Sequence, residues 1–284
     1  MGIQFTNVNF AYNKKEKEHI LKRINLKINA KKEFIALIGE IGSGKSTLVQ
    51  LMNSLLLPTD GYINIFDKKI NFKTPNKELF FIKKKIGLVF QFPEYQLFET
   101  TVLKDVMFGP KNFNKSNLEA IRIAISSLKK VGIEQDLFNV SPFQLSDGQK
   151  RKVAIAGILA MEPSILILDE PTRGLDSNSQ IEIMNFLEKK NKKDEKTIIF
   201  ITHDIDLVAK YANRVIVLEK GNIIFDNSKE SFFNKKEIYK YSFFQEPQSF
   251  RILKFLNQKM GIKFETKYSF EQLLEYLIEI YKNN

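Results

Sequence analysis

Cysteine is absent from this sequence of 284 residues. Its absence excludes disulfide bonds and cysteine-based metal or redox sites, and it fits a reducing compartment. Long apolar runs are absent as well, because none approaches the roughly 18 to 20 residues that a membrane-spanning helix needs. The first residues alternate in polarity as a strand does and lack the layout of a signal peptide. We therefore expect a cytoplasmic protein.

Acidic residues are outnumbered by basic ones. The chain has 44 basic and 33 acidic residues, which give a net charge of +11. Such a balance favours polyanions or an acidic membrane surface as partners. The lysine runs at 83–85 and 189–190, however, lie between apolar segments and lack the interleaved aromatic residues of a single-strand nucleic-acid groove. We therefore interpret the lysines as a solvated surface and expect no nucleic-acid partner.

The most informative segment that is present is a glycine-rich stretch between apolar runs at 34–38 and 48–52. Its nine residues are Gly39, Glu40, Ile41, Gly42, Ser43, Gly44, Lys45, Ser46 and Thr47. The pattern predicts a buried strand, a loop and a helix. Glycines let the loop wrap around an anion with its N–H groups inward, while the helix N-terminus and Lys45 add positive charge. With Ser46 as a hydroxyl ligand for Mg²⁺, the stretch predicts a nucleoside triphosphate site.

Two carboxylates follow a second apolar run at 165–168. Asp169 and Glu170 stand at the carboxyl end of the predicted strand, where open parallel sheets bind ligands. One carboxylate there can hold Mg²⁺, and the next can orient an attacking water. We therefore predict Asp169 as the metal ligand and Glu170 as the general base.

A predicted helix start lies at residues 141–149. Ser146 with Gln149 three positions later is a capping-box pattern, and an apolar run follows it. By itself this pattern describes an ordinary helix start. The free N–H groups of such a start can also bind an anion.

Strand and helix patterns alternate along most of the chain. We expect strands at 3–10, 21–28, 34–38, 62–66, 85–90, 164–168, 197–202, 215–218 and 223–225, and helices at 118–131, 149–161, 177–190 and 205–211. The alternation predicts an α/β fold with a largely parallel, covered sheet and an antiparallel β part. Residues from about 92 to 145 are interpreted as a helical insertion within a nucleotide-binding unit at 1–225.

The remaining residues, 226–284, are expected to form a separate and mostly helical extension. Its last predicted helix has Ser269 as N-cap and Gln272 three positions on. One apolar face is expected on this helix, formed by Phe270, Leu273, Leu274, Leu277, Ile278 and Tyr281. That face would pack on its own domain or on a partner subunit.

Taken together, the motifs resemble those of the ATP-binding-cassette (ABC) ATPases. The matching segments stand in the family's order over roughly residues 3 to 225: 39–47, Gln91, 145–149, 165–170, Gly174-Leu175-Asp176 and His203. The resemblance implies a P-loop ABC-ATPase core with a helical subdomain at about 92–145 and the signature helix after it. It also implies two cassettes that meet head to tail around ATP and Mg²⁺.

The same resemblance implies roles for individual residues. The signature residues would contact ATP held by the partner's phosphate loop, and they are Ser146, Asp147, Gly148 and Gln149. Gln91 would sense Mg²⁺ and the attacking water, while His203, one of only two histidines, would contact the γ-phosphate. Tyr12 would stack on adenine, and Asp176 would lie at the dimer seam.

Three further segments resemble the ATPase subunits of energy-coupling factor (ECF) importers, the second subgroup especially. They lie at 91–99, 108–112 and 154–163. This resemblance implies a heterodimer with a sister ATPase, docked peripherally on a transmembrane coupling subunit at the cytoplasmic face of the membrane. A separate membrane component would bind the substrate, a vitamin or a transition-metal ion, and the C-terminal extension would help to hold the ATPase pair together.

One departure from the family and two alternative functions remain. The signature has Asp147-Gly148 where the family has two adjacent glycines, and a carboxylate near a phosphate adds repulsion, or strain if the backbone needs a glycine conformation. We hypothesise that the composite site receiving this signature hydrolyses ATP more slowly than the other composite site of the pair. The alternatives are a non-transport ABC ATPase of translation or DNA maintenance, and a P-loop kinase.

Overall fold

The computed structural model describes residues 2–13, 18–235, 237–238, 241 and 244–283. Its strands are β1 (Ile3–Phe10), β2 (Leu21–Ile28), β3 (Phe34–Ile38), β4 (Asp60–Ile65), β5 (Lys68–Ile70), β6 (Ile86–Val89), β7 (Ile165–Asp169), β8 (Thr197–Ile201), β9 (Arg214–Glu219) and β10 (Asn222–Ser228). Its α-helices are α1 (Lys45–Met52), α2 (Asn76–Lys85), α3 (Val102–Asn112), α4 (Asn117–Lys130), α5 (Asp147–Leu159), α6 (Ser177–Asp194), α7 (Ile205–Tyr211), α8 (Lys229–Asn234), α9 (Gln248–Met260) and α10 (Phe270–Asn283). Short 3-10 helices are η1 (Pro93–Gln96), η2 (Gln135–Asn139) and η3 (Pro142–Gln144).

The strands of this described part form two sheets. The smaller sheet has the order β2-β1-β4-β5 and is antiparallel. The larger has the order β10-β9-β3-β8-β7-β6, in which β9 to β6 are parallel and β10 is an antiparallel edge strand. The predicted α/β fold, with a largely parallel sheet and an antiparallel β part, is therefore confirmed.

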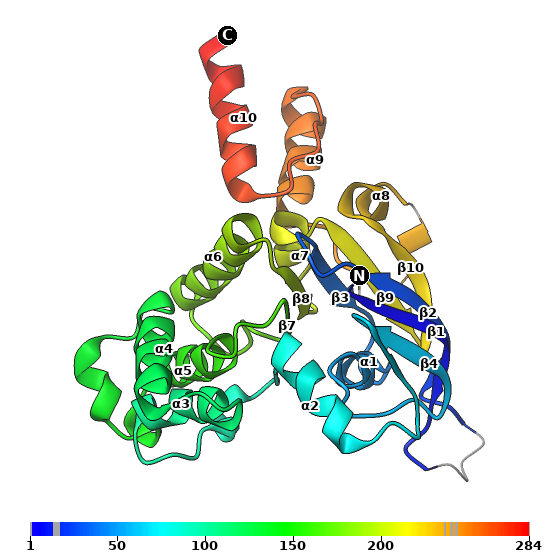
Figure 1. The fold of residues 1–284 in the computed structure, drawn as a ribbon. Helices are drawn as coiled ribbons and strands as arrows, with labels where there is room; N and C mark the ends of the chain where they lie inside the picture. The colour runs from blue at the N-terminus through cyan, green and yellow to red at the C-terminus, as the bar shows by residue number, and fades with distance from the viewer. Residues whose placement is uncertain (1, 14–17, 236, 239–240, 242–243, 284) are drawn as a thin grey trace.

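The central residues of the parallel strands are apolar because the large sheet is covered on both faces. In β3, Phe34 and Ala36 belong to a core shared with the helices α3 to α8, while Ile35 and Leu37 belong to a second core shared with α1 and the small sheet. Alternate residues of a strand point to opposite faces, so every position of a doubly covered strand is buried. Figure 1 shows α1 between the two sheets.

Strand register brings three strand ends to one edge of the large sheet. Ile201 of β8 is opposite Asp169 of β7 on one side and Leu37 of β3 on the other. The loops that leave β3, β7 and β8 therefore begin at the same level. These are the loops that carry the predicted phosphate loop, the two carboxylates and His203.

The helical insertion consists of η1, α3, α4, η2 and η3 and leads into α5. Helix α4 starts at a capping box: the Ser116 hydroxyl accepts from the Glu119 N–H, and the Glu119 carboxylate accepts from the Ser116 N–H. Its buried residues, among them Ala124 and Leu128, recur at helical spacing and face α3 and α5. Figure 1 shows these helices together at one side of the large sheet.

The C-terminal part is helical, and Figure 1 shows α9 and α10 projecting from the side opposite α2 and α3. Leu253 of α9 packs against Leu273 and Tyr276 of α10 in a small core. Lys210 of α7 pairs with Glu271 of α10, and this hydrogen bond lowers the pKa of Glu271 to about 2. The described helices include none that is long and apolar enough to cross a membrane.

Several details differ from the sequence-based expectations. Strand β5 and helix α2 are additional elements, and β10 continues to Ser228, past the expected limit of the nucleotide-binding unit at 225. The expected apolar face of α10 is divided, because Leu273 is buried whereas Phe270, Leu274, Ile278 and Tyr281 are exposed. The side-chain amide oxygen of Gln272 accepts from the backbone N–H of Tyr268 rather than from that of the N-cap, Ser269.

Candidate active site

The phosphate loop is held close to the end of β9. A Cβ atom on Gly39 would lie 2.1 Å from the Leu218 carbonyl oxygen. Only glycine therefore fits at the position where the loop leaves β3. Gly44, with φ of 102°, is the left-handed residue that precedes α1. Glycine adopts this conformation without the steric cost that other residues incur. The backbone therefore turns sharply between β3 and α1, as the sequence predicts.

The side chain of Lys45 folds back onto the phosphate loop and places its ammonium group there. The Lys45 ammonium donates to the carbonyl oxygens of Gly39, at 2.9 Å, and Glu40, at 2.7 Å. Burial lowers the pKa of Lys45, and the charges of Asp169 and Glu170 oppose this shift. An anion that replaced the two carbonyls would bring a full negative charge to a partly desolvated ammonium.

The remaining loop residues divide into buried and open ones. Ser43 is buried, and its hydroxyl has no hydrogen-bond partner among the described residues. Thr47 is buried on α1, while Ile41 and Gly42 lie at the open tip of the loop. A buried hydroxyl without a partner is uncommon, so the Ser43 side chain is available to a ligand of the loop.

Asp169, at the end of β7, meets the first turn of α1. The Ser46 hydroxyl donates to the Asp169 carboxylate at 2.9 Å. Burial raises the pKa of Asp169, and this hydrogen bond opposes the shift. The two predicted oxygen ligands of Mg²⁺ thus lie side by side in a partly buried place where a cation would stabilise the ionised carboxylate.

Glu170 and His203 are brought together from two different loops. The Glu170 carboxylate oxygen is 2.9 Å from Nδ1 of His203, and its side chain is 12% exposed against 74% for the histidine. The Glu170 backbone has φ of 50°, and its N–H donates to the Ile201 carbonyl at 3.0 Å. The end of β8 therefore fixes the turn from which Glu170 extends toward His203.

Tyr12 lies near the phosphate loop, and Gln91 follows β6 in the chain. The Tyr12 ring is 64% exposed, contacts Phe10 edge-on, and has its hydroxyl 3.2 Å from the Thr47 hydroxyl. This ring presents a free face beside the phosphate loop. Gln91 is half-buried and forms no hydrogen bond with Ser46 or Asp169 in the described structure.

The signature segment begins α5. Ser146 accepts from the Gln149 N–H at 3.3 Å, and the Gln149 side chain accepts from the Ser146 N–H at 3.0 Å, which forms the expected capping box. Asp147 pairs with Lys150, and neither Asp147 nor Gly148 has a positive φ. The backbone therefore needs no glycine conformation here, so the condition for strain at Asp147 is not met and repulsion is the remaining effect. Across the described residues, no hydrogen bond or ion pair joins this segment to the phosphate loop of the same chain.

Arg151 is a structural residue that the sequence reasoning did not identify. Its side chain is 4% exposed, and its guanidinium donates to the carbonyls of Pro171, at 3.3 Å, and Arg173, at 2.6 Å. The Glu94 carboxylate of η1 lies 3.7 Å from the same group. Arg151 thus ties the signature helix both to the loop after Glu170 and to the stretch after Gln91. Arg151 stands between Lys150 and Lys152 in the polar first turns of α5, so no feature of the sequence set it apart.

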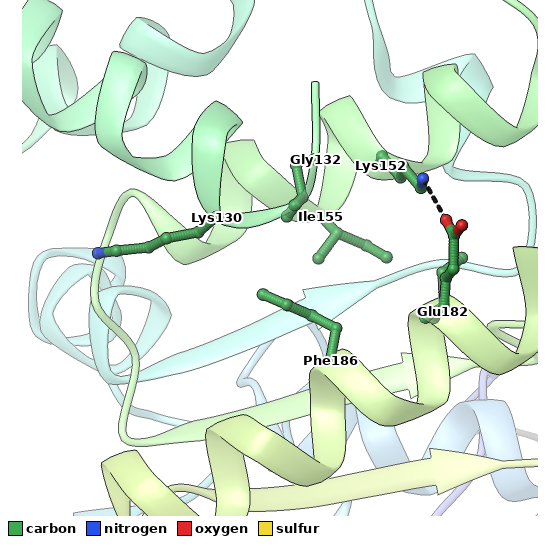
Figure 2. A pocket seen from close by; sticks show the side chains of 8 residues that line it. Lys130, Gly132, Lys152, Ile155, Glu182 and Phe186 are labelled. Atoms are coloured by element: carbon green, nitrogen blue, oxygen red, sulfur yellow. Dashed lines mark hydrogen bonds and ion pairs between the residues drawn. The ribbon is translucent and has the colours of Figure 1, made fainter. Parts of the chain in front are cut away.

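A cavity of about 360 Å³ lies between α4, α5 and α6, away from the phosphate loop. Figure 2 shows the apolar side chains of Ile155 and Phe186 pointing toward each other from α5 and α6, and the Lys152–Glu182 ion pair, 2.6 Å long, beside them. This pair joins α5, which carries the signature, to α6, which starts at the N-cap Asp176. Both helices are therefore positioned together.

Comparison with known proteins assigns the family. Residues 21–173 match the family described as ABC transporter. The energy-coupling factor transporter ATP-binding protein EcfA2 of Ligilactobacillus salivarius is 43% identical over 287 residues, which cover 100% of this chain and 99% of the relative. The protein of the same description from Streptococcus agalactiae is 49% identical over 240 residues, covering 84% and 85%. This chain belongs to the ABC transporter ATPases of the energy-coupling factor group.

Solved structures agree with this assignment. The ATPase matches cbiO1 from Clostridium perfringens, part of the ABC transporter complex cbiONQ, with a TM-score of 0.74 and 37% identity over 91% of this chain and 95% of the other. It matches the ATP-binding cassette MJ0796, a dimer bound to ADP and Pi, with a TM-score of 0.71 and 36% identity over 80% and 98%. The predicted ATP binding and the ATPase activity of an energy-coupling transporter are confirmed by membership of this family.

Proposed function

We propose that this chain hydrolyses ATP as one half of a heterodimeric ATPase pair that powers an ECF importer for a vitamin or a transition-metal ion. The observation that carries the proposal is the common edge of the large sheet. There Lys45, the Ser46–Asp169 pair and the Glu170–His203 pair meet, while the signature segment stands apart in the same chain. One chain therefore holds two half-sites that do not complete each other.

Mg²⁺ fits the oxygen groups at this edge. Ser46 and Asp169 supply a hydroxyl and a carboxylate, and Gln91 would supply an amide oxygen. Among the described residues there is no cluster of three acidic, histidine or cysteine side chains, so phosphate oxygens and waters would complete the ion's six ligands. When bound, the ion neutralises charge on the β- and γ-phosphates.

In the proposed reaction, Glu170 orients a water molecule in line with the γ-phosphate. The water oxygen forms a bond to the γ-phosphorus, the bond from that phosphorus to the bridging oxygen of ADP breaks, and the water proton goes to the Glu170 carboxylate. His203 holds Glu170 through its Nδ1 contact and leaves its other nitrogen for the γ-phosphate. Lys45 and the loop N–H groups stabilise the phosphate charge.

The signature segment would complete the site of the sister subunit. Ser146 caps α5, and the helix N-terminus with Gly148 and Gln149 would approach the γ-phosphate bound to the partner's loop. Tyr12 would stack on adenine. ATP would then hold the two subunits together, and phosphate release would let them separate.

An apolar groove supports docking on a transmembrane coupling subunit. It has a volume of about 360 Å³ and lies between α2, the stretch after Gln91, α3 and α5. The groove residues include Phe80, Phe98, Phe108 and Met161. Exposed aromatic residues around a groove are typical of helix-binding surfaces. A peripheral position at the cytoplasmic face of the membrane would follow from this docking.

The test is Glu170→Gln in the assembled complex. We expect trapped, closed, ATP-bound dimer with ATP hydrolysis in this site reduced by about 100-fold or more, because the base is removed while its shape is kept. Glu134→Gln, an exposed carboxylate with no ion pair in the described structure, is the matched control. Full turnover in the mutant's own site would refute the assigned base.

Two further observations separate the alternative functions. A phosphorylated small-molecule product in place of inorganic phosphate would identify a kinase. Failure to co-purify with a hydrophobic membrane subunit would favour a non-transport ATPase.

A further inference from the structure

Helix α2 and the strand before it carry a concentration of positive charge. Residues 67–85 contain seven lysines against two acidic residues, a net +5 of the +11 of the whole chain. In the described structure none of these lysines forms an ion pair. Charge of one sign that is not paired within the protein produces a local positive potential at the surface.

Exposed aromatic rings stand among these lysines, on a surface that the sequence alone did not show. Phe80 and Phe81 of α2 are 47% and 44% exposed, although Leu79 and Ile82 of the same helix are buried. An apolar ring of this size normally lies on the buried face of a helix. Two neighbouring rings on the outer face therefore indicate a surface that is covered in the working protein.

Contacts between elements join the rings and lysines into one surface. The ammonium groups of Lys68, from β5, and Lys85, from α2, lie 5.8 and 5.7 Å from the centroid of the Phe81 ring. Phe80 packs on Phe113 at 4.5 Å, and Lys84 lies 5.6 Å from the Phe113 ring. We call these six residues the basic aromatic surface.

The position of the basic aromatic surface fits a membrane. Phe80 and Phe113 also line the apolar groove at α2 and α3, and Figure 1 shows this side of the molecule opposite the projecting helices α9 and α10. Aromatic rings flanked by lysines are the side chains that reside at a bilayer interface, where rings enter the headgroup region and ammonium groups meet lipid phosphates.

We propose that the basic aromatic surface binds the headgroups of an anionic phospholipid bilayer directly, beside the groove for the coupling subunit. Lys68, Lys84 and Lys85 contact lipid phosphates, and Phe81, which does not line the groove, enters the headgroup layer. This contact is separate from the proposed docking on a membrane protein, because it requires only lipid. It would hold the ATPase against the membrane while its subunits open and close.

The full chain is tested by flotation with two kinds of vesicle. We expect binding to phosphatidylcholine vesicles that contain about 30 mol% phosphatidylglycerol, little binding to phosphatidylcholine alone, and a marked loss when salt rises from about 0.1 M to about 0.5 M. Replacing Lys83, Lys84 and Lys85 by Gln is expected to weaken binding by on the order of tenfold or more, since each lysine near an anionic surface contributes a several-fold gain. Phe81→Ser should weaken it without changing the salt dependence.

The matched control replaces Lys129, Lys189 and Lys193 by Gln. It changes the net charge equally, at exposed lysines that form no ion pair in the described structure. Circular dichroism establishes that each variant is folded. Equal losses in the two triple variants, or equal binding to neutral and anionic vesicles, would overturn the proposal. It would also be overturned if the α2 variant lost binding to a DNA or RNA oligonucleotide but kept its binding to anionic vesicles.

Discussion

Glu170 illustrates how single residues are positioned at the sheet edge. Its left-handed backbone, with φ of 50°, costs free energy that the hydrogen bond from its N–H to Ile201 helps to offset. The side chain is only 12% exposed, yet it reaches His203, which is 74% exposed. The histidine therefore lies between the carboxylate and solvent, where a nucleotide's terminal phosphate would approach.

This geometry makes His203 a sharp test at the residue scale. Without the Nδ1 contact, Glu170 would lose its orienting partner, and the γ-phosphate would lose a donor. We expect His203→Ala to lower the kcat of ATP hydrolysis by about 100-fold with little change in KM for ATP. His19→Ala is the matched control, because His19 is a half-exposed residue near Asp60 and is outside the site. Similar losses in both variants would remove the assigned role.

Asp147 gives a second residue-scale prediction. Its side chain is 81% exposed and its only described ion pair is with Lys150, so the side chain lies on the surface that would face a partner's phosphate. We expect Asp147→Gly to raise the ATPase rate of the assembled complex several-fold by removing repulsion.

The backbone at Asp147 sharpens this prediction. Because φ is not positive there, a glycine is not needed for the conformation. Asp147→Asn, which removes the charge and keeps the size, should therefore reproduce most of the increase. An unchanged rate in both variants would reject the hypothesis of a slow site, and an increase with Gly alone would identify side-chain volume as the cause.

Among the elements, the sequence predicted best those whose burial is simple. The covered strands β3, β7 and β8 are runs of apolar residues apart from the terminal Asp169 and Thr197, and the predicted bounds agree with the observed ones to within one residue. Helix α2 was missed because only Leu79 and Ile82 are buried while neighbouring rings are exposed, which obscures the helical period. Strand β5 has three residues with one buried position, too few for a periodic signal.

The candidate site was predictable to the extent that local sequence carries it. The phosphate loop, Asp169 and Glu170 follow strand ends, and parallel register brings strand ends together. The contact between Glu170 and His203 depends on how two loops leave their strands, and the contacts of Arg151 are with carbonyl groups about twenty residues away. Such contacts have no periodic signature in the sequence.

Arg151 supplies the prediction for the packing of elements. Arg151→Met would leave the carbonyls of Pro171 and Arg173 without their donor and the Glu94 carboxylate without its ion-pair partner. Buried groups left unpaired in this way cost about 2 to 4 kcal/mol of unfolding free energy. Urea unfolding, followed by circular dichroism, measures this loss.

The neighbouring Lys150 provides the control for Arg151. Lys150→Met removes the same charge from the same helix, but its one ion pair is with the exposed carboxylate of Asp147. We expect a loss of less than about 1 kcal/mol. Equal losses in the two variants would show that the buried guanidinium contacts do not hold α5 to the neighbouring loops.

At the scale of the whole molecule, we propose that the C-terminal helices keep together the two subunits whose half-sites form the proposed active site. A site completed only by a second subunit works only while the two subunits stay close. Helix α10 uses Leu273 and Tyr276 to pack on α9, which leaves Leu274 and Ile278, one helical turn apart, 49% and 45% exposed. An apolar stripe that its own chain does not cover is a surface for another chain.

We therefore expect Leu274→Lys to weaken the ATPase pair without damaging the active site. A buried charge at the seam would raise the dissociation constant of the pair. On dilution, ATPase activity per subunit should therefore begin to fall at a higher protein concentration than it does for the unmodified pair. The plateau activity at high protein concentration should be retained. Leu118→Lys, an exposed leucine on α4 that is 70% accessible, is the control and should follow the unmodified dilution curve. Full activity of the chain as a strict monomer, independent of dilution, would contradict both this prediction and the requirement for two half-sites from different subunits.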